Sequence, residues 1–529
     1  MAVVLSASNE AAQKTHDVWC STGSAPPGLD PSLRIADVGR LLEEALDSIR
    51  DEWFALGRVL GEDSSAPYAH MPSCAANASD FGLMLAWTRL VDRWAAEAEA
   101  VLLVCDDPWL FRHLAARPGV RANRPPPLRP AELRLRLRGI LSRALVSARM
   151  FLAALRFGRQ RSGVSPGGAW ILAYGHPASR ADGFDAYFGD LMGETPGLRR
   201  ILHVDGPLAR AEGLCESGRT FALHAFGSPF AALGLWRARW RPNIEGPNAW
   251  LVRRAAAREG GTGQAAMIAW QVHCQERWLA RAKPAAVAWP WENHSWERAF
   301  VRACRRASCS TVGYQHATVG AREWNYAPAS NPDEASLPDR ILCSGPAGAA
   351  RLRAFGHEER RLAVGGAWRM PSLAPLSRDP AGPVFVALPS DLAIAAEMVA
   401  AIRPLARAGR RFVVRDHPMT PLTFAEEPGL ARADGPLADQ KSVAAVLYAG
   451  TTVGLEAALG GLPTIRFRPE GRVANDVLPD GLDLPAASAT ELGEALRRVS
   501  APLPLDIRAV FAPVARDVWR DALAAGAAG

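Results

Sequence analysis

Long apolar segments and export signals are missing from this chain of 529 residues. It has no run of about 18 or more uncharged apolar residues, which a membrane-spanning helix would need. The N-terminus also lacks a basic stretch followed by an apolar one. We therefore expect a cytoplasmic protein without a membrane-spanning helix.

Paired cysteines are missing too. The eight cysteines are scattered through the chain, with no CxxC pair and no histidines at zinc-finger spacing. This pattern excludes a disulfide framework and a zinc ribbon. It predicts reduced and mostly packed thiols.

Two nucleotide-binding motifs are absent. The chain contains no GxxxxGK[ST] loop and no GxGxxG fingerprint after a predicted strand. Kinase and dehydrogenase functions therefore lose their main support.

Lysine is scarce, and nearly all of the 61 basic residues are arginines, which gives a net charge of +7. These arginines come with no recognition motif or aromatic platform for bases, so we expect no nucleic-acid partner. A hydrophobic fraction of 49% with 22% charged residues is ordinary for a globular protein. The length exceeds what one core supports and predicts two or three domains.

The first domain is predicted at 1–165, as an α/β region. Its first 35 residues look polar and irregular, and helical periodicity covers 41–60 and 81–98. The apolar run 100–105 (AVLLVC) is typical of a buried parallel strand.

A basic amphipathic helical segment is predicted at 125–161, where nine arginines alternate with apolar residues and Glu132 is the only acid. Such a helix can lie on an anionic membrane surface, which would make the protein peripheral on the inner membrane. It can equally be a solvated helix packed on its own domain. The sequence leaves both interpretations open.

Two series of alternating strands and helices follow, and they predict two open parallel sheets. The first domain of this pair is expected at 166–335, with strands in AWILAY, RILHV, AAVAW and CSTVGY. The second is expected at 336–529, with strands in RILCS, PVFVAL, RRFVVR, SVAAVLYA and PTIRF. A stretch rich in glycine, proline and serine, 365–380, is predicted to be part of a linker between them.

Two loops of the last domain suit a phosphate group. His417 and Pro418 directly follow the strand RRFVV, where a histidine held by the following proline can donate a hydrogen bond. The turn Gly450, Thr451 and Thr452 follows the strand AAVLYA and leads into a helix that carries Glu456. The alternative for the threonines is a plain helix cap.

The order of this HP loop and hydroxyl-rich turn resembles the nucleotide site of GT-B enzymes that use CMP-activated sugars, such as bacterial sialyltransferases and Kdo transferases. The resemblance implies two Rossmann-like domains facing a central cleft, with an N-terminal helical extension. It also implies that His417, Thr451 and Thr452 hold the donor phosphate and that Glu456 lies near the ribose. Thr-Thr stands where serine is commoner in the family.

A second resemblance is carried by WENHSWER from residue 291 and GYQHATV from residue 313. These motifs are similar to those of bacterial surface carbohydrate biosynthesis proteins. Glu292, just past a predicted strand, can deprotonate an acceptor hydroxyl as a general base, or it can be a structural partner of Arg298. His316 can contact the donor or the acceptor, or it can be a buried, satisfied histidine.

Weaker candidates for the acceptor side are His176, Asp205, Asp182 and Asp185, each in or near a loop that follows a predicted strand. No DxD triplet occurs, and metal-dependent GT-A transferases use that motif for their cation. We therefore predict no essential metal and no cofactor apart from the nucleotide-sugar. The leaving nucleotide would be stabilised by His417 and a helix N-terminus.

The sequence thus predicts a GT-B glycosyltransferase that moves Kdo or a nonulosonic acid from a CMP-activated donor to a glycan or lipid-linked glycan of the bacterial surface. A CDP-glycerol-type phosphotransferase and a UDP-sugar 2-epimerase on the same fold are enzymatic alternatives. A non-catalytic scaffold that binds membranes through 125–161 is the alternative from another class.

Overall fold

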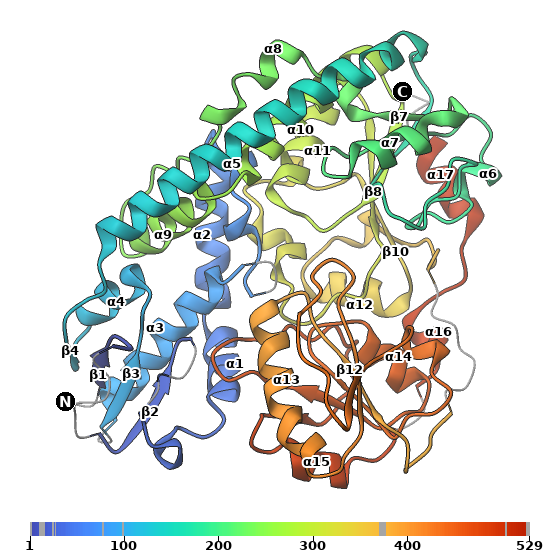
Figure 1. Ribbon diagram of the computed structural model, residues 1–529. Coiled ribbons are helices and arrows are strands. Elements are labelled where there is room, and N and C mark those ends of the chain that lie inside the picture. The colour runs from blue at the N-terminus through green and yellow to red at the C-terminus, as the bar shows by residue number, and fades with distance from the viewer. Residues whose placement is uncertain are drawn as a thin grey trace.

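The computed structural model describes residues 3–9, 16–23, 26, 28–76, 79–97, 100–369, 377–502 and 505–524. Its strands form three β-sheets of parallel strands. A seven-stranded middle sheet fills the upper half of Figure 1. A six-stranded C-terminal sheet and a four-stranded N-terminal sheet lie in the lower half. The predicted α/β architecture of Rossmann-like parallel sheets is confirmed.

The N-terminal sheet has the strand order β2-β3-β1-β4. Its strands are β1 Val3–Ser6, β2 Val18–Ser21, β3 Val101–Val104 and β4 Val120–Ala122. The strand predicted at 100–105 is confirmed by β3, but the prediction of an irregular first 35 residues is wrong at β1 and β2. Each of these two strands has only four residues, which is too short for a visible pattern. Both form because they pair with β3 from a distant part of the chain.

Four helices accompany this sheet: α1 Val38–Ser48, α2 Arg50–Glu62, α3 Phe81–Ala96 and α4 Pro108–Ala115. The single helix predicted over 41–60 is divided at Ile49. The Ser48 hydroxyl donates to the carbonyl of Ala45 at 2.7 Å, and such a bond disturbs the helical ladder. With its sheet and helices, this part is an α/β unit, and "helical extension" describes it too narrowly.

The middle sheet has the order β11-β10-β9-β8-β5-β6-β7. Its strands are β5 Ala169–Ala173, β6 Arg199–Leu202, β7 Thr220–Ala222, β8 Ala286–Pro290, β9 Ser310–Gln315, β10 Arg340–Cys343 and β11 Leu362–Val364. They are mostly buried, as expected for a parallel sheet covered by helices. The helices in this stretch of the chain are α6 Leu191–Glu194, α7 Leu208–Leu214, α8 Pro229–Ala232, α9 Ala249–Gly260, α10 Gln264–Ala282, α11 Ser295–Arg306 and α12 Pro346–Ala354. Of these, α9 buries its apolar residues in the core of the N-terminal part.

Strand β10 corrects the predicted division at 335/336. The sequence placed RILCS at the start of the last series, but β10 pairs with β9 and β11 in the middle sheet. The apolar run alone could not show which sheet would accept this strand, since both sheets are parallel and buried. The division of strands between the two sheets at 335/336 is therefore wrong. The domain boundaries 1–165, 166–335 and 336–529 stay a prediction.

The C-terminal sheet has the order β14-β13-β12-β15-β16-β17. Its strands are β12 Val384–Ala387, β13 Phe412–Arg415, β14 Leu430–Arg432, β15 Ala445–Tyr448, β16 Thr464–Phe467 and β17 Ala486–Ala487. Its helices are α13 Leu392–Arg407, α14 Val453–Leu459, α15 Leu492–Arg498 and α16 Ile507–Val510. Helix α13 is capped by Asp391, whose carboxylate accepts the backbone N–H of Ala393 at 2.8 Å.

The last helix, α17 (Arg516–Ala524), returns to the middle sheet, where it lies at the upper right of Figure 1. Trp519 is fully buried there against Phe188 and Tyr314 and donates its indole N–H to Gly365 at 3.0 Å. The returning chain runs beside the start of the predicted linker 365–380, since Ala367 donates to Ala512. Residues 370–376 of that linker lie outside the described residues.

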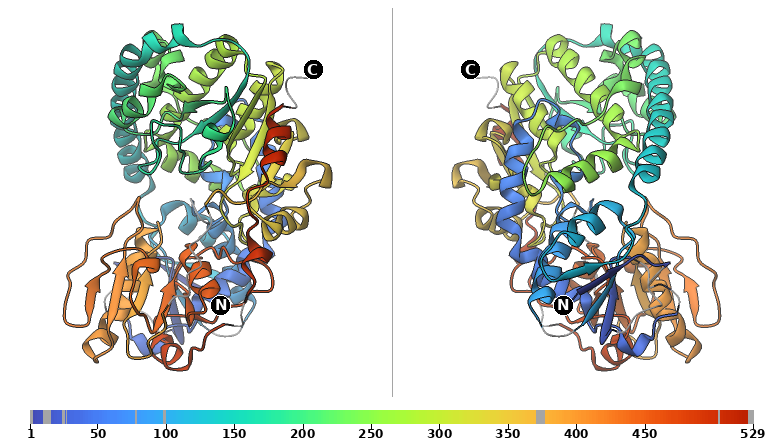
Figure 2. Two further views of the ribbon diagram at one scale, coloured as in Figure 1. Left: turned by 90° about the vertical axis from the view of Figure 1, so that its right-hand side faces the viewer. Right: turned by 90° about the vertical axis from the view of Figure 1, so that its left-hand side faces the viewer.

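Helix α5 (Leu128–Phe157) confirms the helix predicted within 125–161. With 30 residues it is about 45 Å long. It crosses the outer surface of the molecule beside α9 and α10, on the side away from the C-terminal sheet (Figures 1 and 2). Among the described residues, no helix is both long and apolar enough to cross a bilayer.

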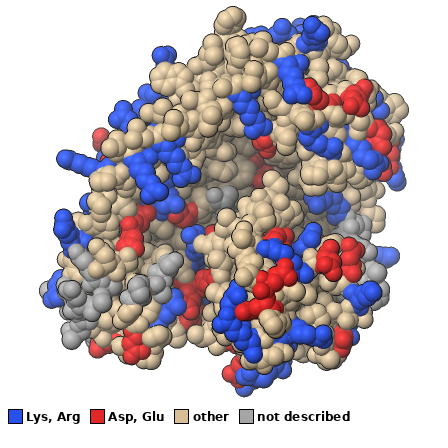
Figure 3. Space-filling model, in the orientation of Figure 1, with Lys and Arg blue, Asp and Glu red and all other residues tan. Residues whose placement is uncertain are grey.

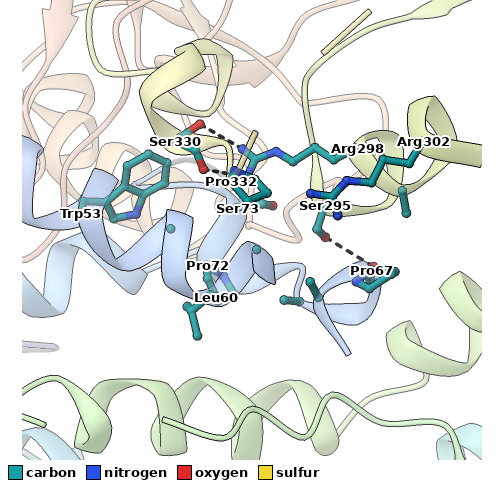
Figure 4. A pocket seen from close by; sticks show the side chains of 15 residues that line it. Trp53, Leu60, Pro67, Pro72, Ser73, Ser295, Arg298, Arg302, Ser330 and Pro332 are labelled. Carbon is teal, nitrogen blue, oxygen red and sulfur yellow. Dashed lines mark hydrogen bonds between the residues drawn. The ribbon is translucent and has the colours of Figure 1, made fainter. Parts of the chain in front are cut away.

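The N-terminal part contacts both the part that holds the middle sheet and the part that holds the C-terminal sheet. On one side, Glu43 of α1 forms a buried ion pair with Arg466 of β16, with N–O distances of 2.6 and 3.0 Å. On the other side, it encloses a small cavity of about 40 Å³ together with α11, and Ser295 donates to the carbonyl of Pro67 at the cavity edge (Figure 4). These contacts fix the N-terminal part at the junction of the two halves.

The eight cysteines are free thiols, and seven of them are buried. This confirms the prediction of packed thiols.

Candidate functional site

A cavity of about 580 Å³ lies between the middle and C-terminal sheets. The middle part contributes Glu292 and Thr318 from the loops after β8 and β9, and the C-terminal part contributes His417 and Thr451 from the loops after β13 and β15. Figure 3 shows the surface hollowed between the upper and lower halves. Ligands of open α/β sheets bind at the carboxyl ends of the strands, so this cavity is the candidate active site.

Glu292 and His294 form the central pair of the site. His294 Nε2 lies 3.0 Å from Glu292 Oε2, and the Glu292 side chain keeps 42% of its surface exposed to the cavity. Burial would raise the pKa of the Glu292 carboxyl, but the hydrogen bond and charge of His294 lower it to about 2. Burial opposes the charged form of His294 too, yet its contacts with Cys74 and Glu292 raise its pKa well above the ordinary value. Glu292 therefore stays ionised near neutral pH.

Glu297 positions the loop that carries this pair. Its carboxylate accepts the backbone N–H groups of His294 at 2.5 Å and Glu292 at 3.0 Å, and the indole N–H of Trp289 at 2.8 Å. The first of these bonds is half of a capping box that starts α11. Between them, Asn293 is fully buried with a left-handed φ of 58°.

The alternative that Glu292 is a structural partner of Arg298 is wrong. Arg298 is buried and donates to the carbonyl of Asn293, and to the carbonyl and hydroxyl of Ser330 at 2.9 and 3.0 Å (Figure 4). Glu292 is left facing the cavity.

The N-terminal part adds His70, Ser73 and Cys74 to the site, and the sequence pattern did not predict any of them. His294 Nδ1 lies 3.2 Å from Ser73 Oγ and 3.7 Å from Cys74 Sγ, and the His70 ring lies 5.4 Å from the His294 ring. Burial and the neighbouring His294 lower the pKa of His70 to about 4. A neutral His70 next to a charged His294 is the expected state near pH 7.

His316, after β9, also lies beside Glu292, with 3.9 Å between His316 Nε2 and Glu292 Oε1. Its ring packs edge-on against Tyr187 at 5.1 Å. Burial lowers its pKa, and a hydrogen bond with the Tyr314 backbone acts in the opposite direction. The position of His316 is therefore compatible both with contact to a ligand and with a buried, satisfied histidine.

His417 lies in the loop after β13 and lines the cavity with Pro418. The backbone N–H of Met419 donates to His417 Nδ1 at 3.3 Å. Burial lowers the pKa of His417, so the neutral ring carries its proton on Nε2, which can donate to a ligand. The neighbouring Asp416 is held by Arg432 and Leu422.

Thr451, Thr452 and Glu456 line the same cavity. Gly450 has a left-handed φ of 57° that turns the chain after β15. Thr452 occupies the cap position of α14 but makes no capping bond with its side chain. Thr451 Oγ1 is buried and has no partner among the residues described. The alternative of plain helix caps therefore finds no side-chain bond to support it.

Arg369 is a further cavity residue that sequence analysis missed. Its guanidinium lies 5.7 Å from the ring centre of Tyr187, and its charge opposes the burial that raises the pKa of Glu456. Arg369 lies in the connection between β11 of the middle sheet and β12 of the C-terminal sheet. No sequence motif around it indicates a binding role.

A second cavity of about 490 Å³ shares Glu292 and His294 with the first and is also lined by His70. Asp205 lies in this acceptor-side cavity, with Oδ1 3.2 Å from His203 Nδ1. We call this cavity the acceptor-side cavity because the sequence predicts that Asp205 lies on the acceptor side. That role stays a prediction.

The other weak candidates lie apart from the two cavities. His176 contacts Tyr187 and accepts the Ala178 N–H at 3.0 Å. Asp185 is fully buried in an ion pair with Arg200, and Asp182 pairs with Arg180 at the surface. A structural role explains both carboxylates.

One G-x-S-x-G sequence, GVSPG at 163–167, comes before β5 rather than after a strand. A nucleophile turn requires a strand in front of it and a helix behind it, so this serine is not placed as an esterase nucleophile. Across the described ranges, no group of three His, Cys, Asp or Glu side chains is arranged to hold a metal ion. The absence of an essential metal stays a prediction.

No protein-family model matches the sequence, and the curated proteins give no match. Among solved structures, a UDP-GlcNAc 2-epimerase of Methanocaldococcus jannaschii in complex with UDP-GlcNAc and UDP is similar at 12% identity, covering 67% of this chain and 98% of its own, with a TM-score of 0.39. UGT89C1 of Arabidopsis thaliana has 15% identity, covering 69% and 96%, with a TM-score of 0.37. A lipopolysaccharide outer core galactosyltransferase has 10% identity, covering 63% and 88%, with a TM-score of 0.35.

Proposed function

We propose that this chain is a glycosyltransferase that uses a nucleotide-activated sugar. One observation carries the proposal: a single cavity is lined by Glu292 and His294 on one side and by His417 and Thr451 on the other. The Glu292 carboxylate can receive a proton, and His417 and Thr451 offer hydrogen-bond donors to a phosphate. Transfer of a sugar from a nucleotide requires both groups at one place.

In the proposed reaction, the acceptor oxygen attacks the anomeric carbon while the bond from that carbon to the phosphate oxygen breaks. The hydroxyl proton goes to Glu292, and the electron pair leaves with the nucleotide phosphate. A carboxylate with a pKa of about 2 is a weak base, so proton transfer accompanies the attack instead of preceding it. His417 Nε2–H and the free hydroxyl of Thr451 would hold the leaving phosphate.

The finer proposal is a CMP-activated Kdo or nonulosonic acid as donor and a glycan of the lipopolysaccharide, capsule or O-antigen as acceptor. It rests on the resemblance of the HP loop and the Thr-Thr turn. Glu456, whose pKa is raised by burial, would lie near the ribose as a hydrogen-bonding group. The donor is a co-substrate, and no other cofactor is proposed.

Nucleotide binding provides the test. We expect CMP to raise the thermal unfolding midpoint more than CDP, UDP, GDP or dTDP, since a ligand present at 100 times its Kd stabilises the fold by about 2.7 kcal/mol. His417→Ala should lose most of this stabilisation because it removes the Nε2 donor.

Met419→Ala is the matched control, because its side chain is 82% exposed in the same loop and does not line the cavity. It should respond to CMP like the wild type. If UDP is preferred and UDP-GlcNAc is converted without an acceptor, the epimerase replaces the transferase. A CDP preference favours the phosphotransferase, and no response to any nucleotide favours the scaffold.

A further inference from the structure

Helix α5 carries its apolar face outward. Five leucines on that face are between 55% and 74% exposed, and they follow one another at helical spacing: Leu133, Leu137, Leu141, Leu145 and Leu152. Ile140 and Leu155 lie on the same face and are exposed by 38% and 57%. An apolar stripe of this length on the surface marks an interaction site.

The inward face of α5 explains why the stripe points outward. In the middle of the helix it carries small and polar residues, namely Gly139, Arg143 and Ser147. A side chain at Gly139 would overlap the carbonyl of Gly260, and Arg143 donates to the carbonyls of Trp236 and Gly260. The helix is thus attached to its domain by close backbone contact and polar bonds in its middle and by burial of Met150 and Phe157 near its end, and the five leucines of the outward face take no part in that attachment.

The segment next to α5 extends the apolar surface. Ser147 donates to the carbonyl of Ala232, which places residues 229–237 against the helix. This segment exposes Phe230 by 83%, Leu233 by 53% and Trp236 by 44%. Figure 1 shows it as the short helix α8 directly beside α5.

Positive charge flanks the stripe on both sides. On a helical projection, Arg136 falls on one flank, and Arg134 and Arg138 fall on the other, whereas Arg156 is paired with Glu212. Glu132 is the only acid on the helix. Figure 3 shows basic side chains spread along this edge of the molecule.

We propose that α5 and residues 229–237 form a docking face for a bilayer of anionic phospholipids. The leucines and Phe230 would enter the acyl boundary while the flanking arginines meet lipid phosphates, which is how a basic amphipathic helix binds at an interface. A second copy of this chain suits the face less well, because the rows of arginines would oppose each other across the contact.

The docking face lies next to the acceptor-side cavity. Val146 of α5 lines that cavity together with Glu292 and Asp205. A membrane on the outer side of α5 would therefore place a lipid-linked acceptor near this cavity. This last step rests on the proposed transfer function, whereas binding of the bilayer does not.

Vesicle sedimentation tests the docking face without any activity assay. The full chain should sediment with vesicles of about 30% phosphatidylglycerol in phosphatidylcholine, because this composition gives a negative surface that attracts arginines. It should stay in solution with vesicles of phosphatidylcholine alone. Leu141→Ser/Leu145→Ser/Leu152→Ser should weaken binding about tenfold or more. Arg134→Gln/Arg136→Gln should weaken it about tenfold and flatten its salt dependence.

Val59→Ser is the matched control, because Val59 is an apolar residue exposed by 55% on α2, away from the face. It should sediment like the wild type, and thermal unfolding checks that every variant is folded. No sedimentation of the wild type with anionic vesicles overturns the proposal, and so does a leucine variant that binds unchanged. Sedimentation velocity that shows a dimer broken by the leucine variant would assign the face to a second copy instead.

Discussion

Glu292→Gln should lower kcat by about 10² to 10⁴, the range that a general base contributes. The amide keeps the size of the side chain but cannot take the acceptor proton, and it also loses the charge that pairs with His294 at 3.0 Å. Release of CMP from the donor, measured with and without acceptor, reports the change. Binding of CMP should survive, because His417 and Thr451 lie on the other side of the cavity.

Glu276→Gln is the control for this prediction. Glu276 lies on α10 with its side chain 56% exposed and a distant partner, Arg306 at 3.9 Å. Its substitution should leave kcat within a factor of two or so of the wild type, since surface changes are usually small in effect. A Glu292→Gln variant that transfers sugar at the wild-type rate would move the base to another group, with His316 the first to examine.

Glu43→Ala should destabilise the folded chain by about 3 kcal/mol, the lower end of what the loss of one partner costs in a buried ion pair. The side chains of Glu43 and Arg466 are only 8% and 10% exposed, so the variant leaves a buried guanidinium without its main partner. Asp476 lies 3.4 Å from Arg466 and still pairs with it in the variant, so we expect a loss of stability at the low end of that range. Urea unfolding of both proteins measures the difference.

Glu44→Ala supplies the matched control one residue away. Glu44 is 47% exposed and pairs with Arg40 and Arg93 at the surface. Its loss should change the free energy of unfolding by no more than about 0.5 kcal/mol. Equal effects of the two substitutions would contradict the assignment of Glu43 as the contact between the N-terminal part and the C-terminal sheet.

The effect of Glu43→Ala should depend on pH. Burial alone would raise the pKa of Glu43, but the bonds and charge of Arg466 lower it below its ordinary value of 4.5. A carboxyl with a lowered pKa in the folded state stabilises the fold fully above its unfolded pKa, and this contribution is lost as the pH falls. The difference between wild type and variant should therefore be complete at pH 7 and shrink below about pH 4.5.

Much of the chain's local structure follows from its sequence. The apolar runs around Ala169, Ala286 and Phe412 predict β5, β8 and β13, because a strand covered on both faces needs only a short block of apolar residues. The loops behind these strands then predict that Glu292 and His417 face a ligand, since parallel strands end at one edge. That part of the candidate site needs no tertiary information.

Only the tertiary structure showed that three parts of the chain contribute residues to the site. His70 and Cys74 follow no pattern of their own and reach His294 only because α2 and the loop after it pack on α11. Arg369 reaches the cavity because the chain crosses between the two sheets there. Such contacts join residues hundreds of positions apart, and no short window of sequence contains both partners.

The sequence by itself determined the parallel α/β class, most strands, the long basic helix and the loops with His417 and Thr451, because each depends on residues near one another. Only the tertiary structure decided that β10 belongs to the middle sheet, that α5 turns its leucines outward and that the N-terminal part completes the site. Periodicity records which residues share a face of a helix or strand. Which face is buried depends on what the rest of the chain offers to pack against it.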